Sequence, residues 1–163
     1  MRVHEADGVH SSAVYSECEM YRYALTREWG AGKRLVFIML NPSKATELAN
    51  DPTIERCQRR AVALGFGAFR VVNLFAWRAT DPRDLRAAAE PIGVANDPTI
   101  QEAVAWADQV IAAWGVHGDL LGRGEAVKAK LDGPIYTLGL TKHGHPRHPL
   151  YLRYDQQPVL WFR

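Results

Sequence analysis

The chain has 163 residues, of which 47% are hydrophobic and 23% charged, and 20 Lys and Arg against 18 Asp and Glu give a net charge of +2. This composition is that of an ordinary globular protein and excludes disordered, collagenous and disulfide-rich classes. The length suits one compact domain, so we expect residues 1–163 to form a single α/β domain.

No apolar segment of the sequence is long enough to cross a membrane. The longest candidate runs from Leu35 to Leu40, far short of the ~20 residues that a membrane-spanning helix needs. The first residues also lack the apolar segment and cleavage site of a secretory signal. We therefore expect a cytoplasmic protein with no membrane partner, and we expect it to be a monomer.

Apolar runs alternate with helical segments from residue 21 onward. Residues 21–29, the glycine-containing turn at 30–33 and the apolar run at 34–40 predict a β-hairpin that leads into a buried strand. Asp51 and Pro52 are typical of a helix start, which predicts a helix at 53–64. Further strands are expected at 69–75, 109–114 and 135–140, and further helices at 98–107 and 124–131. The pattern predicts a three-layer α/β/α fold with a mainly parallel central sheet of about four strands, plus an N-terminal β-hairpin.

Polar residues follow each of the four buried strands that the sequence predicts. The four segments are Asn41-Pro42-Ser43, Asn73-Leu74-Phe75, Trp114-Gly115-Val116-His117 and the loop from Thr141 to Pro149. Ligands of parallel α/β sheets bind at the carboxyl ends of the strands. We therefore expect Asn41, Asn73, His117 and the histidines of the last loop to meet in one cleft.

The last loop is rich in histidine and basic residues, namely Lys142, His143, His145, Arg147 and His148. In one interpretation its three histidines bind a metal ion, with His117 as a further ligand. However, the loop holds no acidic residue or cysteine, and its basic residues would repel a cation. A solvated surface loop is the second interpretation. We favour the third, a loop that faces an anion or phosphate, and we expect no metal and no cofactor.

Two asparagines at strand ends each have a structural and a functional interpretation. Asn41 either caps its strand in an Asx-type turn or presents a fixed amide that orients a water molecule or a polar group of a substrate. Asn73 lies inside an apolar run and needs hydrogen-bond partners if it is buried. Those partners belong either to a neighbouring loop or to a substrate.

A second group of basic residues comprises Arg56, Arg59, Arg60 and Arg70. Taken alone, the first three favour a solvated helix face. Together with Lys142 and Arg147 they are also what contacts to nucleic-acid phosphates would require.

Several sequence segments of the chain resemble the DUF1643 family, a bacterial and phage family named for its unknown function. The segments are residues 21–27, Leu40-Asn41-Pro42-Ser43 with Asp51-Pro52-Thr53, Val72-Asn73-Leu74-Phe75 and residues 144–152. They are spread over most of the chain, which makes the resemblance specific.

More distantly, the same series is similar to motifs of the uracil-DNA glycosylase superfamily. The similar segments are Asn41-Pro42, Asn73, Trp114-Gly115 and residues 145–150, in the order in which that superfamily carries them. The chain departs from the pattern in two ways: Leu40 precedes Asn41 where a glycine two residues before the amide is usual, and the last loop has one extra residue. The extra residue leaves open whether His145 or His148 corresponds to the histidine of the superfamily.

This resemblance implies a DNA glycosylase that acts without a metal ion on a damaged or modified base, in DNA repair or modified-base processing. Asn41 would position the attacking water, and His145 or His148 would hydrogen-bond the departing base as it becomes negative. The base or substrate would contact Pro42, Ser43, Asn73, Phe75, Trp77, Trp114, Gly115 and His117, with an aromatic platform at Phe75 or Trp77. Phosphates of DNA would contact Lys142, His143 and Arg147.

Two other functions remain open at this point. One is a noncatalytic module that binds nucleic acid or a nucleotide. The other is the hydrolysis of a free nucleoside or nucleotide derivative, which needs the same pocket but no surface for duplex DNA.

Overall fold

The computed structural model describes residues 1–163 and contains eight strands, four α-helices and one 3₁₀ segment. The strands are β1 (Arg2–Ala6), β2 (Val9–Tyr15), β3 (Arg22–Glu28), β4 (Arg34–Met39), β5 (Ala68–Asn73), β6 (Gln109–Ala112), β7 (Ile135–Thr137) and β8 (Val159–Phe162). The helices are α1 (Pro52–Ala63), α2 (Pro82–Ala87), α3 (Asn96–Trp106) and α4 (Arg123–Lys130), and the 3₁₀ segment is η1 (Val116–Gly122). None of the helices has the length and apolar character needed to span a bilayer.

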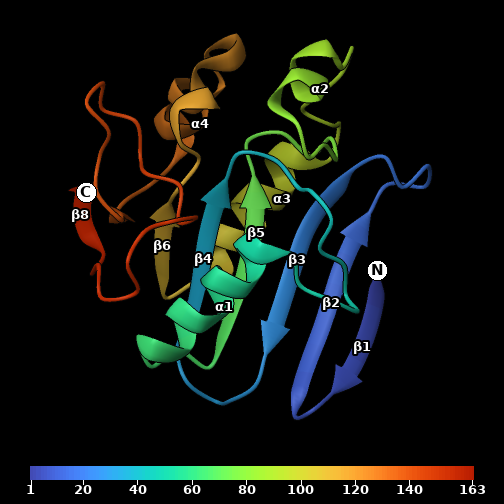
Figure 1. Ribbon diagram of the computed structural model, residues 1–163, viewed down its shortest axis with the longest axis vertical. Helices are drawn as coiled ribbons and strands as arrows, with labels where there is room; N and C mark the ends of the chain where they lie inside the picture. The colour runs from blue at the N-terminus through green and yellow to red at the C-terminus, as the bar shows by residue number, and fades with distance from the viewer.

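All eight strands form one mixed sheet in the order β1-β2-β3-β5-β4-β6-β7-β8 (Figure 1). Four of its seven pairings are antiparallel and three, those of β5, β4, β6 and β7, are parallel. The predicted three-layer α/β/α fold with a mainly parallel sheet of about four strands is therefore wrong. The sequence interpretation missed β1, β2 and β8 because none of them carries a long apolar run. β1 is mostly exposed, and β2 and β8 are only partly buried.

The predicted N-terminal hairpin is also wrong. β3 and β4 follow one another in sequence but are not paired, because β5 lies between them and pairs antiparallel with β3 and parallel with β4. The true hairpin joins β1 and β2 through Asp7 and Gly8, both with positive φ (53° and 78°). An Asp-Gly pair in this conformation is typical of a two-residue hairpin turn, so the sequence did contain the necessary signal.

The central strands are buried on both faces. Along β4, Val36 and Ile38 pack with α3 on one face, whereas Leu35, Phe37 and Met39 pack with α1 on the other. Successive side chains of a strand point to opposite faces, so an unbroken apolar run requires cover on both sides. Helices α1 and α3 provide that cover over the middle of the sheet, with α1 in front of it and α3 behind it in Figure 1.

Helix α1 begins as its sequence predicts. Asp51 is the N-cap, its Oδ1 accepts a hydrogen bond from Ile54 N (2.9 Å), and Pro52 occupies the first turn. The sequence Asn-Asp-Pro-Thr-Ile occurs twice, at residues 50–54 and 96–100. The second copy begins α3 differently, because no side chain caps this helix and Asn96 is fully buried. The same five residues therefore do not start the two helices in the same way.

The order of the parallel strands places a crevice at one end of the sheet. The chain leaves β4 for β5 on one side through α1 and later reaches β6 on the other side of β4 after α3. A sheet whose strand order reverses in this way opens at the carboxyl ends of the strands on either side of the reversal. The segments after β4, β5 and β6 are therefore brought to one place.

The C-terminal segment is attached to α1 by two arginines. Arg56 donates to the carbonyl oxygens of Pro149 and Leu152. Arg60 is 0% exposed and donates to the carbonyl oxygens of Arg153 (3.0 Å) and Gln156 (2.8 Å). Both guanidinium groups are thus engaged inside the protein, and of the first three arginines of the basic cluster only Arg59 lies on a solvated helix face.

We expect Arg60→Ala to destabilise the protein by about 2–4 kcal/mol, because it removes the donor of two carbonyl groups in the C-terminal segment together with a large buried side chain. Urea unfolding measures the change in the free energy of unfolding. The matched control is Arg59→Ala, whose side chain is 66% exposed and pairs only with Glu55, and we expect a change within about 0.5 kcal/mol. Equal effects of the two substitutions would contradict this role of Arg60.

Candidate functional site

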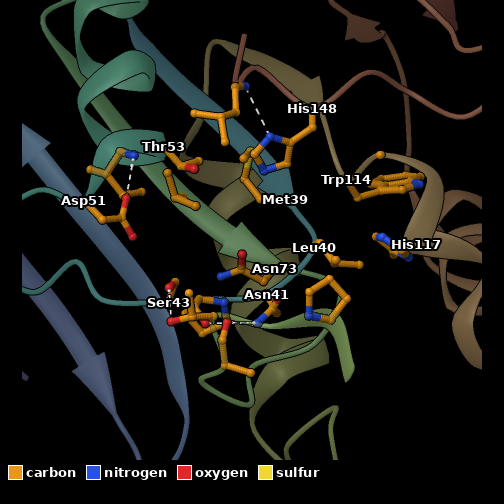
Figure 2. Close-up of a pocket in the computed structure, with 18 of the residues that line it drawn as sticks. Met39, Leu40, Asn41, Ser43, Asp51, Thr53, Asn73, Trp114, His117 and His148 are labelled. Atoms are coloured by element: carbon orange, nitrogen blue, oxygen red, sulfur yellow. Dashed lines mark hydrogen bonds between the residues drawn. The ribbon is translucent and has the colours of Figure 1, made fainter. Parts of the chain in front are cut away.

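A cavity of about 740 Å³ lies at the carboxyl ends of the parallel strands. It is lined by segments that follow β4, β5 and β6, by the N-terminal turn of α1 and by the loop after residue 147. Eight predicted site residues line it, namely Asn41, Pro42, Ser43, Asn73, Trp114, Gly115, His117 and His148. Figure 2 labels six of these, all except Pro42 and Gly115, around one space. The volume is in the range of small-molecule sites in proteins.

Asn73 is the last residue of β5 and is 1% exposed. Its backbone carbonyl accepts a hydrogen bond from Asn96 Nδ2 (2.9 Å), and the next carbonyl, of Leu74, accepts from Asn96 Nδ2 (3.0 Å) and Arg123 Nε (2.8 Å). The strand end is therefore held firmly from α3 and α4.

The side-chain amide of Asn73 has no such partner. Neither its Nδ2 nor its Oδ1 forms a hydrogen bond, although both atoms are buried. Figure 2 shows the group directed into the space between Asn41 and His148, with no interaction drawn to it. An unpaired buried polar group costs about 1–3 kcal/mol. The structural interpretation, in which a neighbouring loop satisfies this amide, is therefore wrong.

The amide nitrogen of Asn41 is engaged within the protein, whereas the amide oxygen is not. Its Nδ2 donates to the carbonyl oxygens of Pro42 (3.0 Å) and Ala79 (2.7 Å), so the amide plane is fixed by the backbone around it. The Oδ1 atom forms no hydrogen bond within the protein and is the atom left to accept one from a ligand or water. Asn41 thus has the structural role expected of a turn residue and keeps one acceptor at the cavity.

The loop after β7 brings His148 rather than His145 to the cavity. Gly115 N donates to Pro146 O (2.8 Å), which joins this loop to the end of β6. Gly115 has a φ of 74°, and a Cβ at this position would lie 3.4 Å from the Cβ of His148, so the two segments pass close together. His145 instead lines a separate cavity of about 150 Å³ beside Trp114.

The hydrogen bonding of His148 fixes which nitrogen carries its proton. Nδ1 accepts a hydrogen bond from Leu150 N (3.2 Å), so in the neutral ring the proton is on Nε2. Burial lowers the pKa of His148 below its usual value, and the negative charge of Asp51 opposes that effect. His148 is therefore a neutral donor at pH 7, suited to a carbonyl oxygen or a developing negative charge.

Six predicted residues lie outside the cavity. Phe75 is a core side chain at 0% exposure, and Trp77 packs edge-on against Tyr21 with ring centroids 5.4 Å apart. The others are His145 and the exposed residues Lys142, His143 and Arg147. Arg147 donates to Leu140 O (3.3 Å) within its own loop. No group of three or more His, Cys, Asp or Glu side chains is placed to hold a metal ion.

The sequence interpretation missed polar residues that the fold adds to the cavity, chiefly Arg22, Asp51 and Thr53. Asp51 was recognised as a helix cap, and a helix that follows a parallel strand often directs its N-terminus at the ligand, so its position was open to prediction. Asp51 Oδ2 also accepts from Ala45 N (3.2 Å). Arg22 lies at the start of β3, and no local pattern links it to the other strand ends.

We expect His148→Gln to reduce the loss of stability that acid causes. The folded pKa lies below the usual 6.5, so the unfolded chain takes up a proton first and stability falls as the pH drops from about 6.5 toward the folded pKa. Removing this histidine should weaken the pH dependence by up to about 1.4 kcal/mol per pH unit in that window.

The free energy of unfolding in urea, measured at intervals between about pH 7 and about pH 5, tests this expectation. His143→Gln is the matched control, because His143 is exposed and lies on the same loop. The same slope for His148→Gln and the wild type would contradict the expectation.

Comparison with known proteins gives one match. Searches of the curated proteins and of the solved structures find none, so the resemblance to the uracil-DNA glycosylase superfamily gains no support from them. The match is to the family described as "Protein of unknown function (DUF1643)" and covers residues 22–150, from the start of β3 to the loop that carries His148. The chain therefore belongs to the DUF1643 family.

Proposed function

We propose that the protein binds a nucleobase in this cavity and hydrolyses the N-glycosidic bond between that base and its sugar, without the help of a metal ion. The observation that carries the proposal is the amide of Asn73, buried in the cavity wall with both polar atoms free. Its neighbours at the cavity, Asn41 and His148, each leave one polar atom for a ligand.

The Asn73 amide suits the edge of a base. A carboxamide presents one donor and one acceptor side by side, and base edges carry the complementary pair. A bidentate contact of this kind satisfies both atoms of Asn73 at once. Because the strand end is held by Asn96 and Arg123, the amide would need little rearrangement on binding.

The remaining groups match the charges that develop when the bond breaks. As the C–N bond breaks, its electron pair moves to the base, which becomes negative, while the sugar becomes oxocarbenium-like. The Nε2–H of His148 can donate to an oxygen of the departing base. Asn41 Oδ1 can orient the water whose oxygen bonds to the anomeric carbon, and the proton that this water loses ends on the base nitrogen.

One observation favours binding without catalysis as the second candidate. The amide of Asn41 donates to two carbonyl groups and cannot itself take a proton. A site that depends on this amide orients water but does not ionise it. Hydrolysis would then be slow unless the base is already a good leaving group.

We expect Asn73→Ala to lower base release at least about 100-fold, because the edge of the base loses both partners. The assay incubates the protein with chelator and with nucleotides and oligonucleotides that carry uracil, hypoxanthine or modified pyrimidines, and chromatography measures the free base. Asn73→Asp should change which base is released, since it replaces the amide donor with an acceptor.

Gln101→Glu is the control for this assay, because it makes the same change of group on the exposed side of α3. Release that requires a divalent metal ion would overturn the proposal. Binding that depends on Asn73, with no release from any substrate, would establish the noncatalytic alternative.

We expect His148→Ala to lower the rate of release about 10²–10³-fold, the usual cost of losing one donor to a developing anion. His145→Ala should change it by less than about threefold, because His145 lies in the separate small cavity. Single-turnover rates of the two variants, measured side by side, decide which histidine acts. A larger loss for His145→Ala would reverse the assignment.

A further inference from the structure

Four arginines of the protein are almost completely buried, namely Arg22, Arg27, Arg60 and Arg123, and their partners differ. Arg123 forms a salt bridge with Asp97. Arg60 donates to two carbonyl groups of the C-terminal segment at 3.0 Å or less. Arg27 donates to Asn50 Oδ1 (2.9 Å) and Thr46 O (2.6 Å). Arg22, which is 1% exposed, donates only to Ala45 O (2.8 Å). A buried nitrogen without a partner occurs in Arg22 (Nε), Arg60 (Nε) and Arg27 (Nη1), so Arg22 differs from the other two in making a single hydrogen bond. Of the four, Arg22 alone lines the large cavity.

The charge of Arg22 is not compensated within the protein. No carboxylate lies within the 4.0 Å of a salt bridge, although Asp51 attracts the guanidinium from farther away. Burial lowers the pKa of Arg22 to about 10, which leaves the group charged at neutral pH. A buried charge is costly unless it is paired. An anion in the cavity would supply the missing partner.

The N-terminal turn of α1 lies on the same cavity and adds to this positive region. Pro52, Thr53 and Ile54 all line the cavity, and α1 is 12 residues long. Pro52 has no N–H and Ile54 N donates to Asp51 Oδ1, so the N–H of Thr53 is the donor left free in this turn. Such a donor and the dipole of a helix start attract an anion. Both oxygens of Asp51 accept from backbone N–H groups, and the hydroxyl of Thr53 has no partner in the protein. Lys44 stands at the exposed rim of the same cavity.

We propose that Arg22 and the first turn of α1 bind the phosphate of a free nucleoside monophosphate whose base lies at Asn73. This inference rests on the proposed function for the base and names the class of substrate. A buried guanidinium in the wall of a cavity suits a terminal phosphate, whereas the phosphodiesters of a long strand stay at the surface. Consistent with this, Lys142 and Arg147 lie outside the cavity and Arg56 is engaged with carbonyl groups.

The first experiment uses the unmodified protein and two probes. Thermal unfolding is measured in inorganic phosphate and in chloride at equal ionic strength, and phosphate should raise the midpoint. Calorimetry then compares the 5′-monophosphates of deoxyuridine and deoxyinosine with the matching nucleosides and with a single-stranded oligonucleotide that carries the same base internally. The monophosphate should bind at least about tenfold more tightly than the nucleoside or the oligonucleotide, since it adds a charge-assisted contact.

Arg22→Met should remove the effect of phosphate on the midpoint and the tenfold advantage of the monophosphate, while the affinity for the nucleoside stays unchanged. Arg27→Lys is the control, a buried arginine of β3 outside the cavity. Thr53→Val is the second variant, for the case in which Arg22→Met does not fold, and it should weaken monophosphate binding without changing nucleoside binding. The comparison of phosphate with chloride needs no variant at all.

The outcomes separate this inference from the proposed function. Nucleoside binding that depends on Asn73, with no gain from a phosphate, would overturn the phosphate site and leave the base site standing. A response to phosphate that depends on Arg22, with no preference among bases, would overturn the base site and leave the phosphate site standing. Tight oligonucleotide binding that Arg22→Met does not affect would assign the site to polymeric DNA and overturn the inference.

Discussion

A polar group that is buried away from water needs a partner, and this requirement shapes the end of β5. Asn96 and Arg123 satisfy the carbonyl groups of Asn73 and Leu74, so that α3 and α4 hold the strand in place. The amide of Asn73 is left unsatisfied although two side chains hold the backbone at this point. A rigid wall with one open donor and one open acceptor is a recognition surface, and the proposed base site follows from it.

The need of buried polar groups for partners also distinguishes the arginines that hold the structure together from Arg22, which we assign to a ligand. Arg60 and Arg56 satisfy carbonyl groups of the C-terminal segment, and the loop that carries His148 ends where Arg56 holds it. Arg22 is buried to the same degree as Arg60 but makes one hydrogen bond within the protein. Unpaired buried polar atoms also occur on Arg27, Arg60 and Asn96, but of the residues that carry such atoms only Asn73 and Arg22 line the cavity. The proposed ligand would place its base at Asn73 and its anion at Arg22.

The antiparallel strands make the sheet larger than the sequence predicted, but the cavity lies at the carboxyl ends of the parallel strands. β1, β2 and β3 extend the sheet on one side with antiparallel pairings, and β8 extends it on the other. The cavity depends only on the parallel strands between them, because their carboxyl ends meet around the reversal of strand order. β3 nevertheless contributes its first residue, Arg22, to the cavity, so the antiparallel part adds a charge to a site that the parallel part forms.

The sequence alone determined the buried strands, the helix start at Asp51 and Pro52, and the clustering of Asn41 and Asn73 at strand ends, because apolar periodicity and capping act over a few residues. It did not determine strand pairing, since the insertion of β5 between β3 and β4 is a contact between distant segments. Nor could it decide between His145 and His148, which depends on where Gly115 holds the loop. Burial decides whether an arginine is a surface charge or an unpaired charge in a cavity, and burial exists only once the tertiary structure has formed.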